Sequence, residues 1–256
     1  MQRGKRINWT GQGDFLRIAH RGASAHAPEN TLAAFIKAAE LGADMVEVDL
    51  QASSDGVLVV LHDADLSQTT NGQGIVYCYP LTALQQLDAG DGQRIPTAEE
   101  VITLCLEHDL GIYFELKIGY AASAIAPLIR EHDLYDRVIV ASFRPDWLAD
   151  VKGADSAIRT SVLFHSVHVD AVALARATGA EYVHPCWEYQ TPTPHALLTP
   201  EWMDPVRAAG LGIISWHEER PAELAALRQL RLDGICTNAP ELLCDDPPRT
   251  ARSGRT

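Results

Sequence analysis

Short apolar runs rich in β-branched residues alternate along the chain with amphipathic stretches of about a dozen residues, which is typical of strand–helix units repeated around a parallel sheet. The expected strands cover residues 15–20, 45–50, 57–62, 112–117, 138–143, 159–165, 182–186, 212–217 and 233–237. The expected helices cover residues 31–41, 97–110, 121–133, 145–152, 169–178, 200–209 and 221–230. The pattern predicts an α/β fold, a TIM-type (β/α)8 barrel.

The strand expected over residues 57–62 is one more than a closed eight-stranded barrel needs. It follows the strand over 45–50 after a short polar turn, which suits an antiparallel hairpin, whereas parallel neighbours need a long crossover. We therefore expect a returning arm that brings His62 and Asp63 to the carboxyl ends of the barrel strands, where barrel active sites form. The long segment over 63–95 is then a small cap over the catalytic face, inserted after the second strand.

Carboxylates recur with the period of a strand. Glu47 and Asp49 share one face of their strand, and Glu115 and Lys117 share one face of a later strand. Several carboxylates that converge on a barrel interior repel one another unless a positive charge lies among them. An all-oxygen ligand set suits one divalent cation, Mg²⁺ or Ca²⁺. The alternative is that Glu115 pairs with Lys117 and the other two carboxylates pair with arginines.

Two histidines stand where strands end. His20 and Arg21 follow the first expected strand, and offer an imidazole for proton transfer and a guanidinium for phosphate oxygens. His62 ends the arm, and two histidines beside a phosphodiester can act as general base and general acid. Three further histidines near strand ends could line the pocket or be hydrogen-bonded in its wall: His165, His184 and His217. The histidines expected to be structural or in loops are His108, His132, His168 and His195, whereas His26 is ambiguous.

Composition narrows the class of protein. The chain has 256 residues, which suits one domain over 1–246 followed by a disordered tail over 247–256. Its 21 Lys and Arg against 34 Asp and Glu give a net charge of −13, which disfavours nucleic acid as a partner. The five cysteines lack zinc-type spacing, and no apolar run is long enough to span a membrane. We expect a cytoplasmic protein without membrane insertion, whose oligomeric state is unknown.

Several motifs, matched in order and spacing, resemble those of the glycerophosphodiester phosphodiesterases. They lie at residues 20–22, 28–35, 42–49, 55–63, 69–72, 95–97 and 115–117. The resemblance implies a barrel that binds one divalent cation through Glu47, Asp49 and Glu115. It also implies that His20 and His62 are the acid/base pair and that Arg21 and Lys117 hold the phosphate. The residues expected in the substrate pocket are Glu29, Phe143 and Trp216.

The activity that the resemblance implies is hydrolysis of small-molecule glycerophosphodiesters to sn-glycerol 3-phosphate and an alcohol such as choline, ethanolamine or glycerol. The implied route begins with attack by the neighbouring glycerol hydroxyl, an intramolecular step with a large proximity advantage. Water then opens the resulting cyclic phosphate.

The chain departs from the family pattern mostly near its end. Where a Thr-Val-Asn run is usual, Trp216 is followed by residues 217–219, which read His-Glu-Glu. An expected Thr-Asp pair is replaced by Thr237 and Asn238, and Gln68 stands where an arginine is common. We expect none of these residues to touch the proposed cation ligands or the two histidines, so they should change the alcohol recognised and leave the chemistry intact.

Three other functions are consistent with the fold class. One is a phospholipase-type phosphodiesterase or transferase, which should present an apolar or basic rim to a bilayer. Another is a non-catalytic binding protein, which should have lost a histidine or carboxylate. The third is an aldolase or isomerase that uses Lys117 as an amine nucleophile, which leaves the histidines and carboxylates unexplained.

Overall fold

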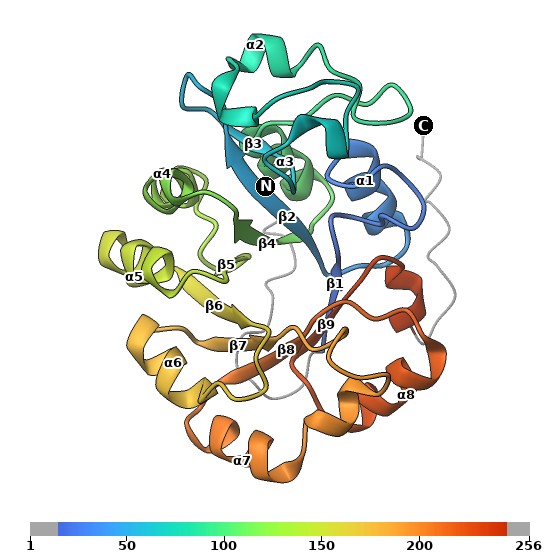
Figure 1. Cartoon of the computed structure of the whole chain (residues 1–256), viewed down its shortest axis with the longest axis vertical. Coiled ribbons are helices and arrows are strands. Elements are labelled where there is room, and N and C mark those ends of the chain that lie inside the picture. The colour runs from blue at the N-terminus through green and yellow to red at the C-terminus, as the bar shows by residue number, and fades with distance from the viewer. Residues whose placement is uncertain (1–14, 245–256) are drawn as a thin grey trace, which may run out of the picture.

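Eight parallel strands form a closed ring in the computed structural model, which describes residues 15–244 (Figure 1). The ring strands are β1 (Leu16–Ala19), β2 (Met45–Ala52), β4 (Gly111–Leu116), β5 (Val138–Ser142), β6 (Arg159–Phe164), β7 (Tyr182–Pro185), β8 (Gly212–Ser215) and β9 (Gly234–Thr237). Pairing of β1 with both β2 and β9 closes the ring. The expected TIM-type barrel is confirmed, while the expected tail over 247–256 lies outside the described residues.

In the described part of the chain, seven helices surround the ring (Figure 1). They are α1 (Leu32–Glu40), α3 (Ala98–Glu107), α4 (Gly119–Glu131), α5 (Pro145–Ala154), α6 (Ala171–Thr178), α7 (Pro200–Ala208) and α8 (Pro221–Gln229). Their ends follow local chemistry, because Thr31 caps α1 with its hydroxyl and Thr97 forms a capping box with Glu100 at the start of α3. Gly179 adopts a left-handed conformation with φ 71° and ends α6.

The extra strand is an antiparallel arm, as its spacing predicts. β3 (Leu58–Val60) pairs with the last residues of β2, with Val60 opposite Leu50. Beyond the strand, the Leu61 amide donates to the carbonyl of Asp49 at 3.1 Å. The arm therefore delivers His62 to the end of β2, beside a proposed cation ligand.

Alternation along the ring strands separates two layers of the core. Val46, Val48 and Phe114 point outward and pack with the helices. The barrel interior is filled by a separate cluster that includes Ile18 and Tyr113. Because side chains alternate along a strand, Glu47, Asp49 and Glu115 must point inward. The face predicted for these carboxylates is confirmed.

The segment over 63–95 contains three short helical turns: η1 (Leu66–Gln68), η2 (Val76–Cys78) and α2 (Leu81–Leu84). Its apolar side chains form a cluster of their own with Val59 at the base of the arm. In Figure 1 the segment lies at the rim of the barrel, beside β3 and α3, rather than across the ring. Two further helical turns are η3 (Pro194–Leu197) and η4 (Pro240–Leu243). Within residues 15–244, no helix is long and apolar enough to cross a membrane.

Candidate active site

Three carboxylates meet inside the mouth of the barrel. Strands β2 and β4 pair in register with Asp49 opposite Glu115, and Glu47 lies two residues before Asp49 on the same face. One oxygen from each of Glu47, Asp49 and Glu115 lies within 4.8 Å of the other two, and all three side chains are buried. No other group of three such side chains within residues 15–244 could hold an ion in this way.

Two cationic side chains border the carboxylates. Lys117 forms an ion pair with Glu115, and its Nζ lies 3.2 Å from Asp49 Oδ1. Arg21 Nε lies 3.4 Å from Asp49 Oδ2. The salt bridge that the sequence offered as an alternative to a cation site is therefore present. Within residues 15–244, Glu47 has no side-chain cation partner of its own, because its donor is the main-chain amide of Arg21, 2.8 Å from Glu47 Oε2.

The turn after β1 makes that amide contact possible. Arg21 has a left-handed backbone with φ 56°, and Gly22 follows with φ 81°. A Cβ atom on Gly22 would lie 2.7 Å from the carbonyl carbon of Ala34, so the close approach of the turn to α1 requires glycine. The turn points the Arg21 amide at Glu47 and its guanidinium across the site.

The three carboxyl groups differ in pKa because each is buried but has different charged neighbours. Burial raises the pKa of Glu115 to about 7, against the attraction of Lys117. Burial and the neighbouring Asp49 and Glu115 charges raise the pKa of Glu47 well above its usual range. Burial also opposes ionisation of Asp49, but Lys117 and Arg21 outweigh it and hold the pKa of Asp49 below its ordinary value. Without a cation, the two glutamates therefore favour their protonated forms, because ionising both beside Asp49 in a buried site is unfavourable.

A divalent cation fits this cluster. Glu47 Oε1 and Glu115 Oε2 are buried and find no hydrogen-bond partner among the described residues. Buried carboxylate oxygens without partners are costly, and hard oxygen donors are the ligands that Mg²⁺ and Ca²⁺ prefer. The donor set therefore suits the expected class of ion, whose identity the geometry leaves open.

His20 lies buried between the ends of β1 and β9. Its Nδ1 is 2.7 Å from the side-chain oxygen of Asn238, and its ring stacks on His217 with 4.7 Å between centroids and 15° between planes. Its Nε2 is buried and has no hydrogen-bond partner within residues 15–244. Burial, together with Arg21 and His217, holds the pKa of His20 well below its usual range. His20 is therefore neutral near pH 7 and has a free ring nitrogen.

These contacts correct one expectation from the sequence. The late departures from the family pattern were expected to stay away from the two histidines, but Asn238 bonds directly to His20 and His217 stacks on it. Glu219, a third departure, accepts a hydrogen bond of 2.8 Å from the Asn238 amide. The spacing of residues along the sequence could not predict these contacts, because the residues meet only when the first and last strands of the ring pair.

His62 has a different setting. Its side chain is 29% exposed, and Asp63 Oδ2 lies 3.2 Å from its Nδ1. It lies close enough to Asp49 to contribute to the low pKa of that carboxyl group. The two histidines thus flank the carboxylates from the ends of β1 and of the arm.

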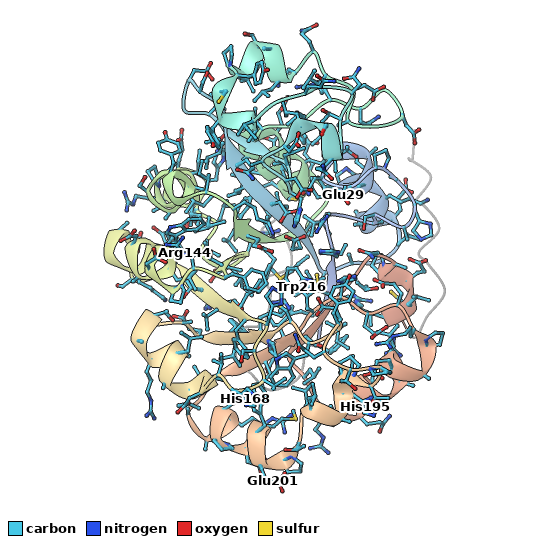
Figure 2. All side chains as sticks on the ribbon, viewed as in Figure 1. Glu29, Arg144, His168, His195, Glu201 and Trp216 are labelled. Carbon is cyan, nitrogen blue, oxygen red and sulfur yellow. The ribbon has the colours of Figure 1, made fainter. Side chains whose placement is uncertain are left out.

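The other predicted site residues line the mouth. Glu29 accepts a hydrogen bond of 2.8 Å from Arg21, and Figure 2 shows it between the ring and α1. Trp216 lies at the centre of the ring in the same view, with its ring edge-on to His20 at 5.2 Å. Phe143 approaches Trp216 at 6.2 Å and forms the opposite wall with His165, on which it stacks at 4.4 Å.

Asn30 was not predicted as a site residue, whereas His184 was left open between the substrate pocket and its wall. Asn30 was a candidate helix cap, but Thr31 caps α1, and Asn30 instead donates to Asp49 Oδ2 at 2.7 Å. Its positive φ of 57° orients the amide toward the carboxylate. His184 was an open candidate for contacting substrate, but its Nδ1 is 2.7 Å from the hydroxyl of Tyr113, and burial lowers its pKa to about 3. It belongs to the interior wall.

The remaining histidines lie away from the carboxylates. His108 and His132 cap the ends of α3 and α4, in agreement with a structural role. His195 lies on η3 and pairs with Glu223 at 2.8 Å. His26 pairs with Glu241 at 2.7 Å.

A model of the glycerophosphoryl diester phosphodiesterase family matches residues 20–242. The chain belongs to this family. A glycerophosphodiester phosphodiesterase from Caldanaerobacter subterraneus is 34% identical to the chain over 240 residues, which cover 89% of this chain and 96% of the relative. The chain is accordingly an enzyme of the glycerophosphodiester phosphodiesterase type, a phosphoric diester hydrolase.

Two solved structures have the same fold. A glycerophosphodiester phosphodiesterase from Agrobacterium tumefaciens superposes with a TM-score of 0.78 at 27% identity, over 88% of this chain and 96% of that one. An Oleispira antarctica phosphodiesterase in complex with the product sn-glycerol-3-phosphate superposes with a TM-score of 0.79 at 27% identity, over 88% and 93% of the two chains.

Proposed function

We propose that this phosphodiesterase hydrolyses glycerophosphodiesters with one divalent cation, Mg²⁺ or Ca²⁺, held by Glu47, Asp49 and Glu115. The observation that carries the proposal is the buried carboxylate cluster, two of whose oxygens have no partner among the described residues. A cation there would polarise the phosphoryl oxygens and neutralise charge that develops on them. The products are sn-glycerol 3-phosphate and an alcohol, which agrees with the ligand of the Oleispira antarctica structure.

Arg21 and Lys117 are the proposed phosphate-binding groups. Both border the carboxylates from the side of the mouth, and neither is held by a single acidic partner. Burial lowers the pKa of Lys117, but Asp49 and Glu115 outweigh it and hold the pKa above its ordinary value. An amine whose pKa is raised in this way favours its protonated form, which suits phosphate binding and does not suit the amine nucleophile of an aldolase.

His20 and His62 are the proposed proton-transfer groups. One imidazole takes the proton of the glycerol hydroxyl next to the phosphate, and the oxygen of that hydroxyl attacks phosphorus. The other imidazole gives a proton to the alcohol oxygen as its bond to phosphorus breaks. In the second half of the reaction the roles reverse, water opens the cyclic phosphate, and both imidazoles regain their starting protonation.

Further parts of the proposal rest on the sequence. The segment over 63–95 is a small cap that begins directly after His62, and one domain spans residues 1–246. The protein is cytoplasmic and acts in the breakdown of deacylated phospholipids, without nucleic acid as a partner. Phe143, Trp216 and Glu29 line the substrate pocket.

The test is release of glycerol 3-phosphate from a panel of glycerophosphodiesters that carry choline, ethanolamine, glycerol or inositol. Purified protein is assayed after treatment with EDTA and again after Mg²⁺ or Ca²⁺ is restored. We expect turnover of at least one diester, its loss on chelation and its recovery with a cation. Absence of glycerol 3-phosphate from every diester in both cations would contradict the proposed function.

A further inference from the structure

The residues that depart from the family pattern gather around one catalytic candidate. Asn238 contacts the His20 ring through its side chain, His217 stacks on that ring, and Glu219 binds the main chain of Asn238. Asn238 therefore gives the His20 ring an uncharged hydrogen-bond partner.

Hydrogen bonding at Asn238 fixes which ring nitrogen of His20 carries the proton. The side-chain oxygen of Asn238 lies 2.7 Å from His20 Nδ1 and 2.9 Å from the Ser24 hydroxyl. An amide oxygen only accepts hydrogen bonds, so Nδ1 must be the protonated nitrogen and Nε2 must carry a lone pair. A free neutral histidine in water prefers the opposite tautomer, with its proton on Nε2.

Main-chain hydrogen bonds hold residue 238 in place. The main-chain carbonyl of Asn238 accepts a hydrogen bond of 3.1 Å from the Ala25 N–H, and the main-chain N–H of Asn238 donates one of 2.8 Å to Glu219. The His20 amide in turn donates to the Thr237 carbonyl at 2.8 Å. Both partners of the Nδ1 hydrogen bond are thus fixed to the paired ends of β1 and β9.

We propose that Asn238 is the positioning residue that makes His20 the general base, because its amide oxygen holds the proton on Nδ1 and leaves Nε2 free to accept a proton. This inference rests on the proposed role of His20 in proton transfer. His62, with Asp63 at its Nδ1, is then the general acid of the first step.

An amide and a carboxylate at position 238 would affect the charged form of His20 differently. Both accept a hydrogen bond from Nδ1–H, but a carboxylate also stabilises the imidazolium that forms when Nε2 takes a proton. The charged and titratable groups near His20 are Arg21, His217 and Asp49, and the first two oppose an imidazolium. With an amide at position 238, the resting His20 therefore stays neutral and returns its proton readily.

The tautomer is measured directly by long-range ¹H–¹⁵N spectra of the full chain labelled with ¹⁵N-histidine, free of metal and substrate. Comparison with His20→Gln assigns the His20 signals. We expect the wild type to show a protonated Nδ1 and an unprotonated Nε2. Asn238→Asp should keep this pattern, Asn238→Ala should move the proton toward Nε2, and Asn71→Ala, a matched change in the segment over 63–95, should leave the His20 signals unchanged.

Steady-state kinetics provide a second test of the role of Asn238. Asn238→Ala should lower kcat about 10- to 100-fold, as loss of an orienting partner commonly does, with little change in KM. Asn238→Asp should recover kcat at alkaline pH, but its acidic limb should move to higher pH because the new carboxylate favours the imidazolium. A merely structural residue would not shift that limb.

Two results would overturn the proposal. One is a wild-type His20 that carries its proton on Nε2, which would mean that the Asn238 amide is turned over and donates to the ring. The other is an unchanged tautomer in Asn238→Ala. If that variant fails to fold, the wild-type and Asn238→Asp spectra still decide the question. Because the spectra need no turnover, a wild type that releases no glycerol 3-phosphate would defeat the proposed function separately.

Discussion

The two sides of the barrel mouth are built from different kinds of side chains. The side formed by β1, β2, β3 and β4 carries the carboxylate cluster, its two cations and the two proposed proton-transfer histidines: His20, Arg21, Glu47, Asp49, His62, Glu115 and Lys117. The side formed by β5 to β8 is an aromatic wall: Phe143, His165, His184 and Trp216. His184 is kept neutral there by burial, which lowers its pKa to about 3.

The difference separates two tasks. The proposed phosphate-binding and proton-transfer groups lie beside buried carboxylates, where electrostatic interactions are stronger than in water. We propose that the aromatic wall excludes water from the opposite side and contacts the uncharged part of a substrate. Changes on the charged side should therefore remove the chemistry, whereas changes on the far side or at the rim should alter binding or specificity.

The sharpest contrast is expected at the two histidines. His20→Ala and His62→Ala should each lower kcat about 10²- to 10⁴-fold, because general acid–base catalysis contributes about that factor. Circular dichroism should show an intact fold in both. His108→Ala is the matched control, since His108 caps α3 away from the carboxylates, and its turnover should stay close to that of the wild type. Near wild-type turnover in His62→Ala would mean that the arm plays no part in proton transfer.

A somewhat smaller effect is expected at Lys117. Lys117→Met should lower kcat about 10²- to 10³-fold, as loss of one group that stabilises transition-state charge commonly does, with a smaller change in stability. Lys117→Arg should recover only part of the activity, because the planar guanidinium group of arginine replaces the compact ammonium group of lysine. Lys37→Met removes an exposed lysine that pairs with Glu40 on α1, and it should change neither kcat nor the unfolding midpoint. A fully active Lys117→Met would reduce Lys117 to a salt-bridge partner of Glu115.

The rim segment should affect the natural substrate more than the chemistry. Replacement of residues 66–90 by a short Gly-Ser linker tests whether the segment is a cap coupled to His62. A cap predicts a much larger loss of kcat/KM for glycerophosphocholine than for a small activated phosphodiester. Equal and near wild-type rates on both substrates would identify the segment as a static extension, in keeping with its own apolar cluster.

The smallest expected effect concerns stability and pH. In chelated protein, burial raises the pKa of Glu115 from 4.5 to about 7, so the folded state holds a proton that the unfolded state releases. The resulting stabilisation is present at low pH and is lost as pH rises from about 4.5 to about 7. Urea midpoints across this window should therefore fall more steeply with pH in the wild type than in Glu115→Gln. Parallel curves would show that Glu115 is not protonated in the folded state.

Local patterns in the sequence predicted the charged side well. A period of two placed Glu47 and Asp49 on the inward face, and a short polar turn identified β3 as an arm that returns beside Asp49. Each of these inferences needed only strand geometry and short-range spacing.

Contacts made by ring closure could not be predicted in the same way. His20 and Asn238 meet because β1 pairs with β9, and a strand's period gives the face of a side chain but not its neighbour on the next strand. The contact of Asn30 with Asp49 was not predicted for a different reason. The left-handed backbone of Asn30 turns a residue that reads as a helix cap into a buried partner of Asp49.

The most direct test of the account measures cation binding and turnover together. Calorimetric titration of Mg²⁺ and of Ca²⁺ into chelated protein should give one site, and glycerol 3-phosphate release should rise in proportion to its occupancy. Glu47→Gln should weaken binding and turnover in parallel, while Glu99→Gln, an exposed change on α3, should affect neither. Full turnover in metal-free protein, or unchanged cation affinity in Glu47→Gln, would contradict the central claim that the buried carboxylates hold a catalytic cation.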